Sequence, residues 1–169
     1  LIGYLRQFSR DGSLDRSFGP GGVVTTRRQS KSAGESLCWA LARDTVTGEI
    51  LMAGNDPPWT TKFGREFVGS WIRRYDANGR LDTTFGRDGI FWEWKYSTPA
   101  RRGGTYPKLI KILPDRSLIV SSYYETRDSK SDHSTIFKVT PDGKLDTSFA
   151  GGGFDVHGFI NAVELQSDG

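Results

Sequence analysis

The sequence predicts an all-β fold made of repeated units, and three observations carry this prediction. One pattern occurs three times without a gap, as QFSRDGSLDRSFGPGGVV at 7–24, RYDANGRLDTTFGRDGIF at 74–91 and KVTPDGKLDTSFAGGGFD at 138–155. The short apolar stretches between the copies are bounded by Gly, Pro, Asp or Asn, as strands are. No window of 12 or more residues has a sustained helical period. A period of 64 to 67 residues therefore indicates an array of repeats.

Four strands are expected in each period, and about eleven in the whole chain. Four antiparallel strands per repeat is the composition of a β-propeller blade, and the short links argue against a Greek-key sandwich. The expected strands are, in order, Tyr4–Phe8, Val23–Arg28, Leu37–Ala42, Ile50–Asn55, Phe67–Tyr75, Ile90–Tyr96, Lys108–Leu113, Leu118–Tyr124, Thr135–Val139, Phe154–His157 and Ala162–Leu165.

Each position of the repeated pattern has a structural explanation. The Asp-Gly or Asn-Gly pair supplies the positive φ of a hairpin turn, the Leu enters the core, the Asp caps one helical turn and the Phe anchors it. Gly19 and Gly86 suit the left-handed residue that ends the turn, whereas Ala150 breaks this rule and Gly151 is expected to replace it. We expect the pattern to connect one blade to the next. Its structural residues are Gly12, Leu14, Asp15 and Phe18, then Gly79, Leu81, Asp82 and Phe85, then Gly143, Leu145, Asp146 and Phe149.

These patterns resemble the delta-60 repeat, a β-propeller family found largely in big bacterial proteins. TPDGKLDTSF at 140–149 and RLDTTFG at 80–86 carry the match to a consensus that reads NPDGSLDTSFG and is followed by a GGV strand. Weaker copies of the second-half pattern LQPDGKILVAG lie at 48–54, 113–120 and 163–169. The repeats here are longer than the usual family unit, with the excess in loops.

The resemblance implies an incomplete propeller segment of about two to three blades. Residues 1–18 would form the last strand and connector of a preceding blade, 19–85 and 86–149 two full repeats, and 150–169 the start of another. The chain begins in mid-strand and stops at a turn-like Ser-Asp-Gly, so we expect a longer protein or an assembly to supply the missing blades.

The resemblance also sets the expected function. The family has no established catalytic site, so it implies a non-catalytic structural, adhesive or protein-interaction scaffold that is extracellular or on the cell surface. The expected partners are the remaining blades or other subunits, with a glycan or protein as a further ligand and no cofactor.

Composition and motifs exclude several other classes. With 23 Lys and Arg against 20 Asp and Glu, the chain is not a strongly basic nucleic-acid domain. It has no apolar run of 18 residues and none of the usual catalytic or metal motifs, so neither an enzyme nor a membrane span is expected. The single Cys38 reads as a small buried hydrophobe, and His133 and His157 fall at non-equivalent repeat positions with surface or packing roles.

The aromatic stretch after the second pattern is the sharpest difference between the copies. On a strand, Trp92, Trp94 and Tyr96 share one face, where the preceding copy has polar residues. These rings, together with Trp59, form a candidate stacking platform for a sugar ring or a partner's apolar surface. The alternative is that they cover a neighbouring loop or a contact between blades.

Two further surfaces are candidates for binding. The insertions at 56–66 and 125–133 link the third and fourth strands of each period, and equivalent loops of a propeller lie on the same side. A tentative anion-binding set comprises Arg27, Arg28, Lys95, Arg101 and Arg102. Ordinary solvated loops and faces are the alternative for both.

Overall fold

The computed structural model describes residues 3–26, 37–55, 59–60, 66–67, 69–93, 105–125 and 132–166. Among these residues the only helix is η1, a three-residue 3-10 turn at Pro20–Gly22. The strands are β1 (Gly3–Arg6), β2 (Val23–Thr26), β3 (Leu37–Arg43), β4 (Ile50–Asn55), β5 (Trp59–Thr60), β6 (Glu66–Phe67), β7 (Ser70–Tyr75), β8 (Ile90–Glu93), β9 (Thr105–Ile112), β10 (Leu118–Glu125), β11 (Asp132–Val139) and β12 (Phe154–His157).

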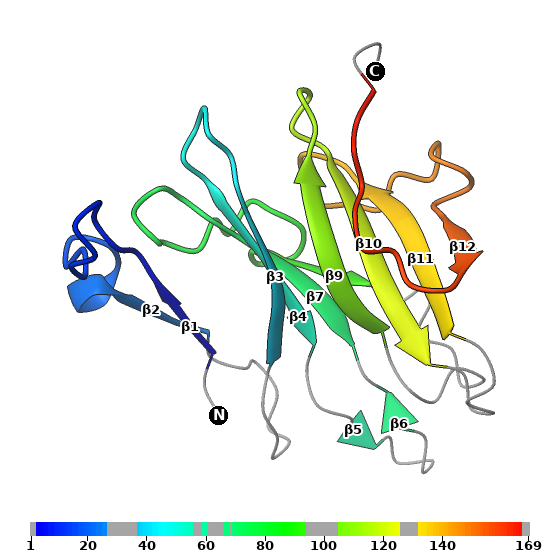
Figure 1. The fold of residues 1–169 in the computed structure, drawn as a ribbon, viewed down its shortest axis with the longest axis horizontal. Coiled ribbons are helices and arrows are strands. Elements are labelled where there is room, and N and C mark those ends of the chain that lie inside the picture. The colour runs from blue at the N-terminus through cyan, green and yellow to red at the C-terminus, as the bar shows by residue number, and fades with distance from the viewer. Residues whose placement is uncertain are drawn as a thin grey trace.

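Apart from the short β5–β6 pair, the strands form three successive antiparallel sheets. The N-terminal sheet is β1-β2, the middle sheet has the order β3-β4-β7-β8, and the C-terminal sheet has the order β9-β10-β11-β12. Figure 1 shows them in a row, with the N-terminal sheet at one end and the C-terminal sheet at the other. The predicted all-β class with antiparallel sheets is confirmed.

Two details of the strand prediction are wrong. The insertion at 56–66 was expected to be a loop, yet β5 and β6 pair within it as a small two-stranded sheet. The expected strand Ala162–Leu165 has no regular structure, because no neighbouring strand pairs with it in the described part of the chain. Side chains hold this segment instead. Phe159 stacks on Tyr123 with ring centroids 5.0 Å apart, and Glu164 accepts a 2.8 Å hydrogen bond from Lys111.

The repeated pattern does not connect one sheet to the next, which corrects the sequence prediction. It lies between β7 and β8, which pair with each other from Ser70↔Glu93 to Arg73↔Ile90, and equally between β1 and β2 and between β11 and β12. A hairpin turn makes the strands on its two sides antiparallel neighbours, so the pattern stays within one sheet. The four-stranded sheets therefore span 37–93 and 105–157, offset by one strand from the repeats predicted at 19–85 and 86–149.

The core lies between sheets, and β4 shows how. Every residue of β4 is buried, and its side chains alternate between the two faces of the middle sheet. Ile50 and Met52 join the first cluster, which also contains Leu5, Phe18, Val24, Trp71, Tyr75 and Ile90. Leu51 and Ala53 join the second cluster, with Ala40, Ile72, Phe85, Phe91, Leu118, Val120, Phe137 and Val139. The middle sheet is thus covered on both faces.

The two large sheets meet at their edge strands β3 and β9. The Trp39 ring lies edge-on to Tyr106 with centroids 5.8 Å apart, and Lys108 Nζ lies 4.4 Å from the Trp39 ring centroid. Cys38 also belongs to β3, which is an edge strand of the middle sheet, and its side chain is exposed. The expectation of a buried Cys38 is therefore wrong.

The second cluster should dominate the stability of the two large sheets. Phe137 is 1% exposed within it, whereas Phe8 is 58% exposed. We expect Phe137→Ala to lower the free energy of unfolding by about 3–5 kcal/mol, because a buried ring leaves a cavity. The matched control Phe8→Ala should cost less than about 1 kcal/mol. Urea unfolding followed by circular dichroism measures both, and equal losses would contradict the assignment of the core.

Candidate functional site

The repeated pattern forms three similar joints, at 11–19, 78–86 and 142–150. In each joint the turn glycine has a φ between 80° and 83°, as a hairpin turn requires. The Asp side chain then accepts a hydrogen bond from the N–H two residues later, and the Phe N–H donates 3.3 Å to the Asp carbonyl. The capping distances are 2.9 Å for Ser17 to Asp15, 2.9 Å for Thr84 to Asp82 and 3.0 Å for Ser148 to Asp146. The predicted turn and cap roles are confirmed.

The residue eight positions before each capping Asp also contacts its carboxylate. Gln7 Nε2 donates a 3.0 Å hydrogen bond to Asp15, Arg74 Nε donates a 2.7 Å hydrogen bond to Asp82, and Lys138 Nζ forms an ion pair with Asp146 at 3.6 Å. A polar side chain that attracts the carboxylate is thus common to the three copies, although the residue differs in each.

These hydrogen bonds stabilise the ionised carboxylates. Side-chain and backbone bonds from Ser17 hold the pKa of Asp15 below its usual value, and the bond from Ser148 does the same to the pKa of Asp146. At Asp82, burial pushes the pKa upward, but the bonds from its donors outweigh this and the pKa is lowered.

At the first seam, where the N-terminal and middle sheets meet, the first joint packs against the second. Phe18 is buried, and a Cβ at Gly79 would lie 2.9 Å from its Cζ atom and 2.6 Å from Val24 Cγ2. The Gly19 N–H donates a 2.8 Å hydrogen bond to the carbonyl of Asn78. Only glycine at position 79 permits this approach.

The second seam, between the middle and C-terminal sheets, repeats this arrangement. Phe85 is buried against Gly143, where a Cβ would lie 2.3 Å from Gly86 N, and the Gly86 N–H donates 2.8 Å to the carbonyl of Asp142. Arg74 adds a 2.7 Å bond from Nη1 to the carbonyl of Pro141. The joints thus bind successive sheets together without connecting them along the chain.

Four residues of the joints differ from the prediction. Leu81 is 37% exposed and lies over Gly89, and the half-buried Leu14 lies over Gly22 in the same way, so neither joins a core cluster, whereas Leu145 packs against the second cluster. Ala150 itself takes the left-handed conformation, with φ 48°, so Gly151 does not replace it. Phe149 is only half-buried, because none of the joints in the described part of the chain packs on it.

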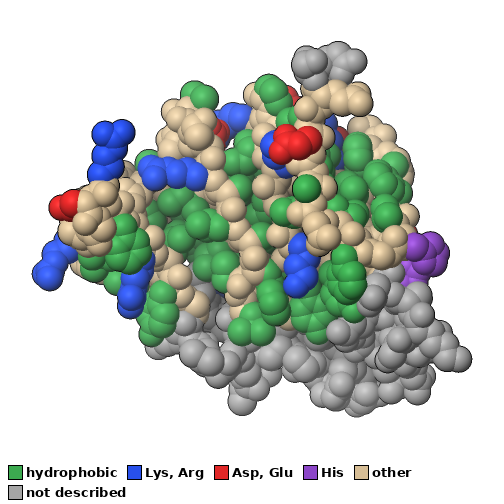
Figure 2. Space-filling view, in the orientation of Figure 1, with side chains coloured by type: hydrophobic (Ala, Val, Ile, Leu, Met, Phe, Trp, Pro, Cys, Tyr) green, Lys and Arg blue, Asp and Glu red, His purple; other side chains and the backbone are tan. Residues whose placement is uncertain are grey.

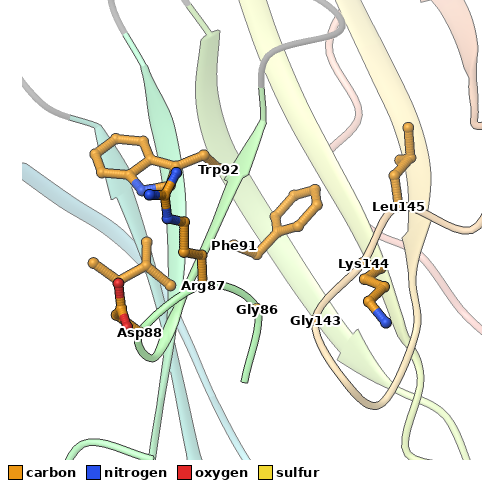
Figure 3. Close-up of a pocket in the computed structure, with 9 residues that line it drawn as sticks. Gly86, Arg87, Asp88, Phe91, Trp92, Gly143, Lys144 and Leu145 are labelled. Carbon is orange, nitrogen blue, oxygen red and sulfur yellow. The ribbon is translucent and has the colours of Figure 1, made fainter. Parts of the chain in front are cut away.

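A cavity of about 650 Å³ opens beside the second joint. Figure 3 shows Phe91 pointing from β8 toward the segment that carries Lys144 and Leu145, while Trp92 and Arg87 lie on the other side of β8. Its polar groups come from the turn after the second joint and from Lys144, whose Nζ is paired with Asp142 at 2.7 Å. The lining residues are Gly86, Arg87, Asp88, Ile90, Phe91, Trp92, Gly143, Lys144 and Leu145.

Trp92 is the one predicted ligand-binding side chain that the structure describes. It is half-buried, lies opposite the buried Trp71 in the β7–β8 pair, and packs against the first cluster. Its ring therefore contributes to the contact between sheets and also borders the cavity. The side chains of Trp59, Trp94 and Tyr96, and all of Arg27, Arg28, Lys95, Arg101 and Arg102, lie outside the described residues.

Two polar groupings were missed by the sequence analysis. Glu93 is buried at the end of β8, where its Oε2 accepts a 3.2 Å bond from Thr105 Oγ1, which lies 2.5 Å from Ser70 Oγ. This chain of side chains links β7, β8 and β9 across the second seam.

His133 and His157 face each other across β11 and β12, with ring centroids 4.4 Å apart. Neither grouping follows the repeat, so the period gave no signal of them.

The close approach at the seams can be tested with turn glycines that differ in their surroundings alone. Gly12 and Gly143 have nearly the same φ, but a Cβ at Gly12 would meet nothing within 4 Å. Gly12→Ala should cost only the strain of a left-handed Ala, about 1 kcal/mol. Gly143→Ala should cost about 1–3 kcal/mol more, because its Cβ overlaps the second joint. Urea unfolding at low protein concentration compares them, and equal costs would contradict the seam geometry.

Acid should weaken the joints. The pKa of an Asp in the unfolded chain is about 3.9, and the folded pKa values of Asp15, Asp82 and Asp146 lie lower. The stabilisation is therefore fully present above the unfolded pKa and is lost as the pH falls through the folded values. Urea midpoints measured from pH 7 to pH 2 should fall in that window, and less steeply in Asp82→Asn. An unchanged slope in the variant would contradict a role for Asp82.

Within the described residues no group of three or more His, Cys, Asp or Glu side chains could hold a metal ion, and none of their helices is long and apolar enough to cross a bilayer. The features that remain as a candidate site are the two seams and the cavity that Trp92 borders. Searches of protein families, curated proteins and solved structures gave no match to this chain.

Proposed function

We propose that the chain is a non-catalytic β-propeller repeat module that acts as a structural, adhesive or protein-interaction scaffold in a larger extracellular or cell-surface protein. The observation that carries the proposal is the repetition of one contact at both seams. Gly19 to Asn78 and Gly86 to Asp142 are equivalent hydrogen bonds of 2.8 Å, and each accompanies a buried Phe. A contact that recurs with the repeat is what an array needs in order to extend.

The order of strands supports a propeller arrangement. In both four-stranded sheets the first strand along the chain lies at one edge and the last at the other. The first strands, β3 and β9, face each other through Trp39 and Tyr106. The hairpins that follow them are also linked, since Arg116 pairs with Glu49 and lies 3.9 Å from Asp44. In a propeller the first strand of each blade would lie toward the central axis and the last strand at the rim, and the observed strand order is compatible with this.

Carbohydrate binding is the second candidate function, and the position of Trp92 favours it. A half-buried indole at the border of a cavity, with Arg87 on the same side of β8 as a hydrogen-bond donor, offers stacking and a polar contact to a sugar ring. The equivalent residue in the preceding copy is Thr25, so such a site would belong to the second seam alone.

A glycan array separates the two candidates. The scaffold function predicts no glycan binding above background. The lectin function predicts binding that falls at least about tenfold in Trp92→Ala, the loss of one stacking contact, and survives in Trp92→Phe. Binding that Trp92→Ala leaves intact would remove Trp92 as the binding residue.

The proposal that the chain is not an enzyme can be tested at the buried carboxylate of Glu93. Glu93 is a buried acidic residue at the end of β8, the strand that lines the cavity, so we take it as the first candidate for acid–base chemistry. We expect no turnover of hydrolase and lyase substrates above a heat-denatured sample. A turnover that Glu93→Gln abolishes while the circular dichroism spectrum is unchanged would overturn the scaffold function.

A further inference from the structure

The outer strand of the C-terminal sheet pairs with a register that differs by one residue from that of the other two sheets. In the N-terminal and middle sheets the pairing is the same at equivalent repeat positions, namely Leu5↔Val24 and Ile72↔Phe91. The third copy of this pair would be Ile136↔Asp155, but Ile136 lies opposite Phe154. Because successive side chains of a strand point to opposite faces, a slip of one residue moves every side chain of β12 to the other face of the sheet.

The turn that leads into β12 also differs from its equivalents, and the slip has a cost. Three consecutive glycines at 151–153, with φ values of 67°, 105° and 131°, stand where the second copy has Arg-Asp-Gly. After the slip Phe154 is 43% exposed, whereas its repeat equivalent Ile90 is 2% exposed. Burial of apolar surface therefore does not favour the observed register at this position.

The slip brings together the only two histidines of the chain. With the register of the other sheets His157 would lie opposite Ser134, whereas it lies opposite His133. The two ring centroids are 4.4 Å apart, and the ring planes are inclined by 48°. The buried Tyr124 stacks on the His133 ring, with centroids 5.2 Å apart and planes within 7°, and this contact orients the imidazole. Figure 2 shows histidine at the surface, at the edge of the molecule that the C-terminal sheet forms.

The separation of the two rings matches that of two imidazoles bound to one metal ion. A metal–nitrogen bond is about 2.0–2.1 Å long and a ring nitrogen lies about 1.1 Å from the ring centre, so a bound metal lies about 3.2 Å from each centre. When the two metal–nitrogen bonds form a right angle, the ring centres are about 4.5 Å apart, against about 5.2 Å for a tetrahedral angle. The observed 4.4 Å fits the right angle, which is typical of tetragonal Cu²⁺ and Ni²⁺ sites. Rotation of the exposed His157 ring about χ2, a broad torsion, can turn a nitrogen toward the metal while the ring centre stays nearly in place.

We propose that His133 and His157 form a two-ligand site for a divalent transition-metal ion that prefers imidazole nitrogen and tetragonal geometry, such as Ni²⁺ or Cu²⁺. Water fills the remaining coordination positions, because no group of three metal-ligating side chains occurs in the described part of the chain. A metal ion that joins β11 to β12 favours the slipped register and offsets the exposure of Phe154. The inference uses the geometry of the C-terminal sheet alone and does not depend on scaffold or glycan-binding activity.

Titration calorimetry with Ni²⁺ tests the site. Tag-free protein that carries Cys38→Ser is the reference, because the exposed Cys38 thiol is a competing metal ligand. We expect one Ni²⁺ per chain, and His133→Ala and His157→Ala should each weaken binding at least about tenfold, because one imidazole alone loses the advantage of chelation. Asp155→Asn is the matched control. Asp155 is an exposed carboxylate two positions from His157 on the same face of β12, and its variant should bind Ni²⁺ like the reference.

A spectroscopic measurement on the unaltered pair keeps the test independent of folding defects in the variants. Paramagnetic Ni²⁺ should broaden the NMR signals of both imidazole rings together in the reference protein. Ni²⁺ should also raise the urea midpoint of the reference and leave that of either His variant unchanged, since an ion that binds only the folded state stabilises it. An absence of binding, binding that survives either His substitution, broadening of one ring alone, or an Asp155→Asn variant that loses binding as the His variants do would each overturn the proposal.

Discussion

The contact between a phenylalanine of one sheet and a turn glycine of the next is the constraint on which the structure depends. Phe18 and Phe85 are buried because Gly79 and Gly143 have no Cβ to hold the neighbouring joint away. The same closeness lets a backbone N–H reach a carbonyl of the next joint at 2.8 Å. A buried aromatic ring supplies much of the stabilisation, and the hydrogen bond fixes the register between sheets. The close spacing and the register of neighbouring sheets thus depend on the absence of a Cβ atom at Gly79 and Gly143.

This constraint explains why burial is unequal along the chain. The middle sheet has a joint contact on each side, so β4 is buried on both faces and contributes to both clusters. Each terminal sheet has such a contact on one side only, and its outer aromatic residues, Tyr4 among them, are exposed. In an array of this kind, stability is close to a sum over neighbouring pairs of sheets. The N-terminal sheet, with only β1 and β2, therefore depends most on its single seam.

The sequence alone was sufficient for the local features and insufficient for the grouping of strands into sheets. Positive φ at Gly12 and the hydrogen bond to Asp15 follow from residues a few positions apart, so turn chemistry predicts them. A repeat, however, has the same period wherever it is cut, and nothing local shows that β8 pairs with β7 rather than beginning the next sheet. Leu81 was misplaced for a related reason, because its exposure depends on how it lies over Gly89, a tertiary contact.

The copies differ on the strands that flank the joints, while the joints themselves stay alike. The joints cannot vary freely, because each is both a turn and half of a seam. The strand that follows each joint can vary, and its position six residues after the seam glycine is Thr25 in one copy and Trp92 in the next. Trp92 gains packing against the first cluster and borders a cavity that the equivalent threonine could not line in the same way. A fixed seam with a variable neighbouring position lets one copy acquire a binding surface while the array keeps its geometry.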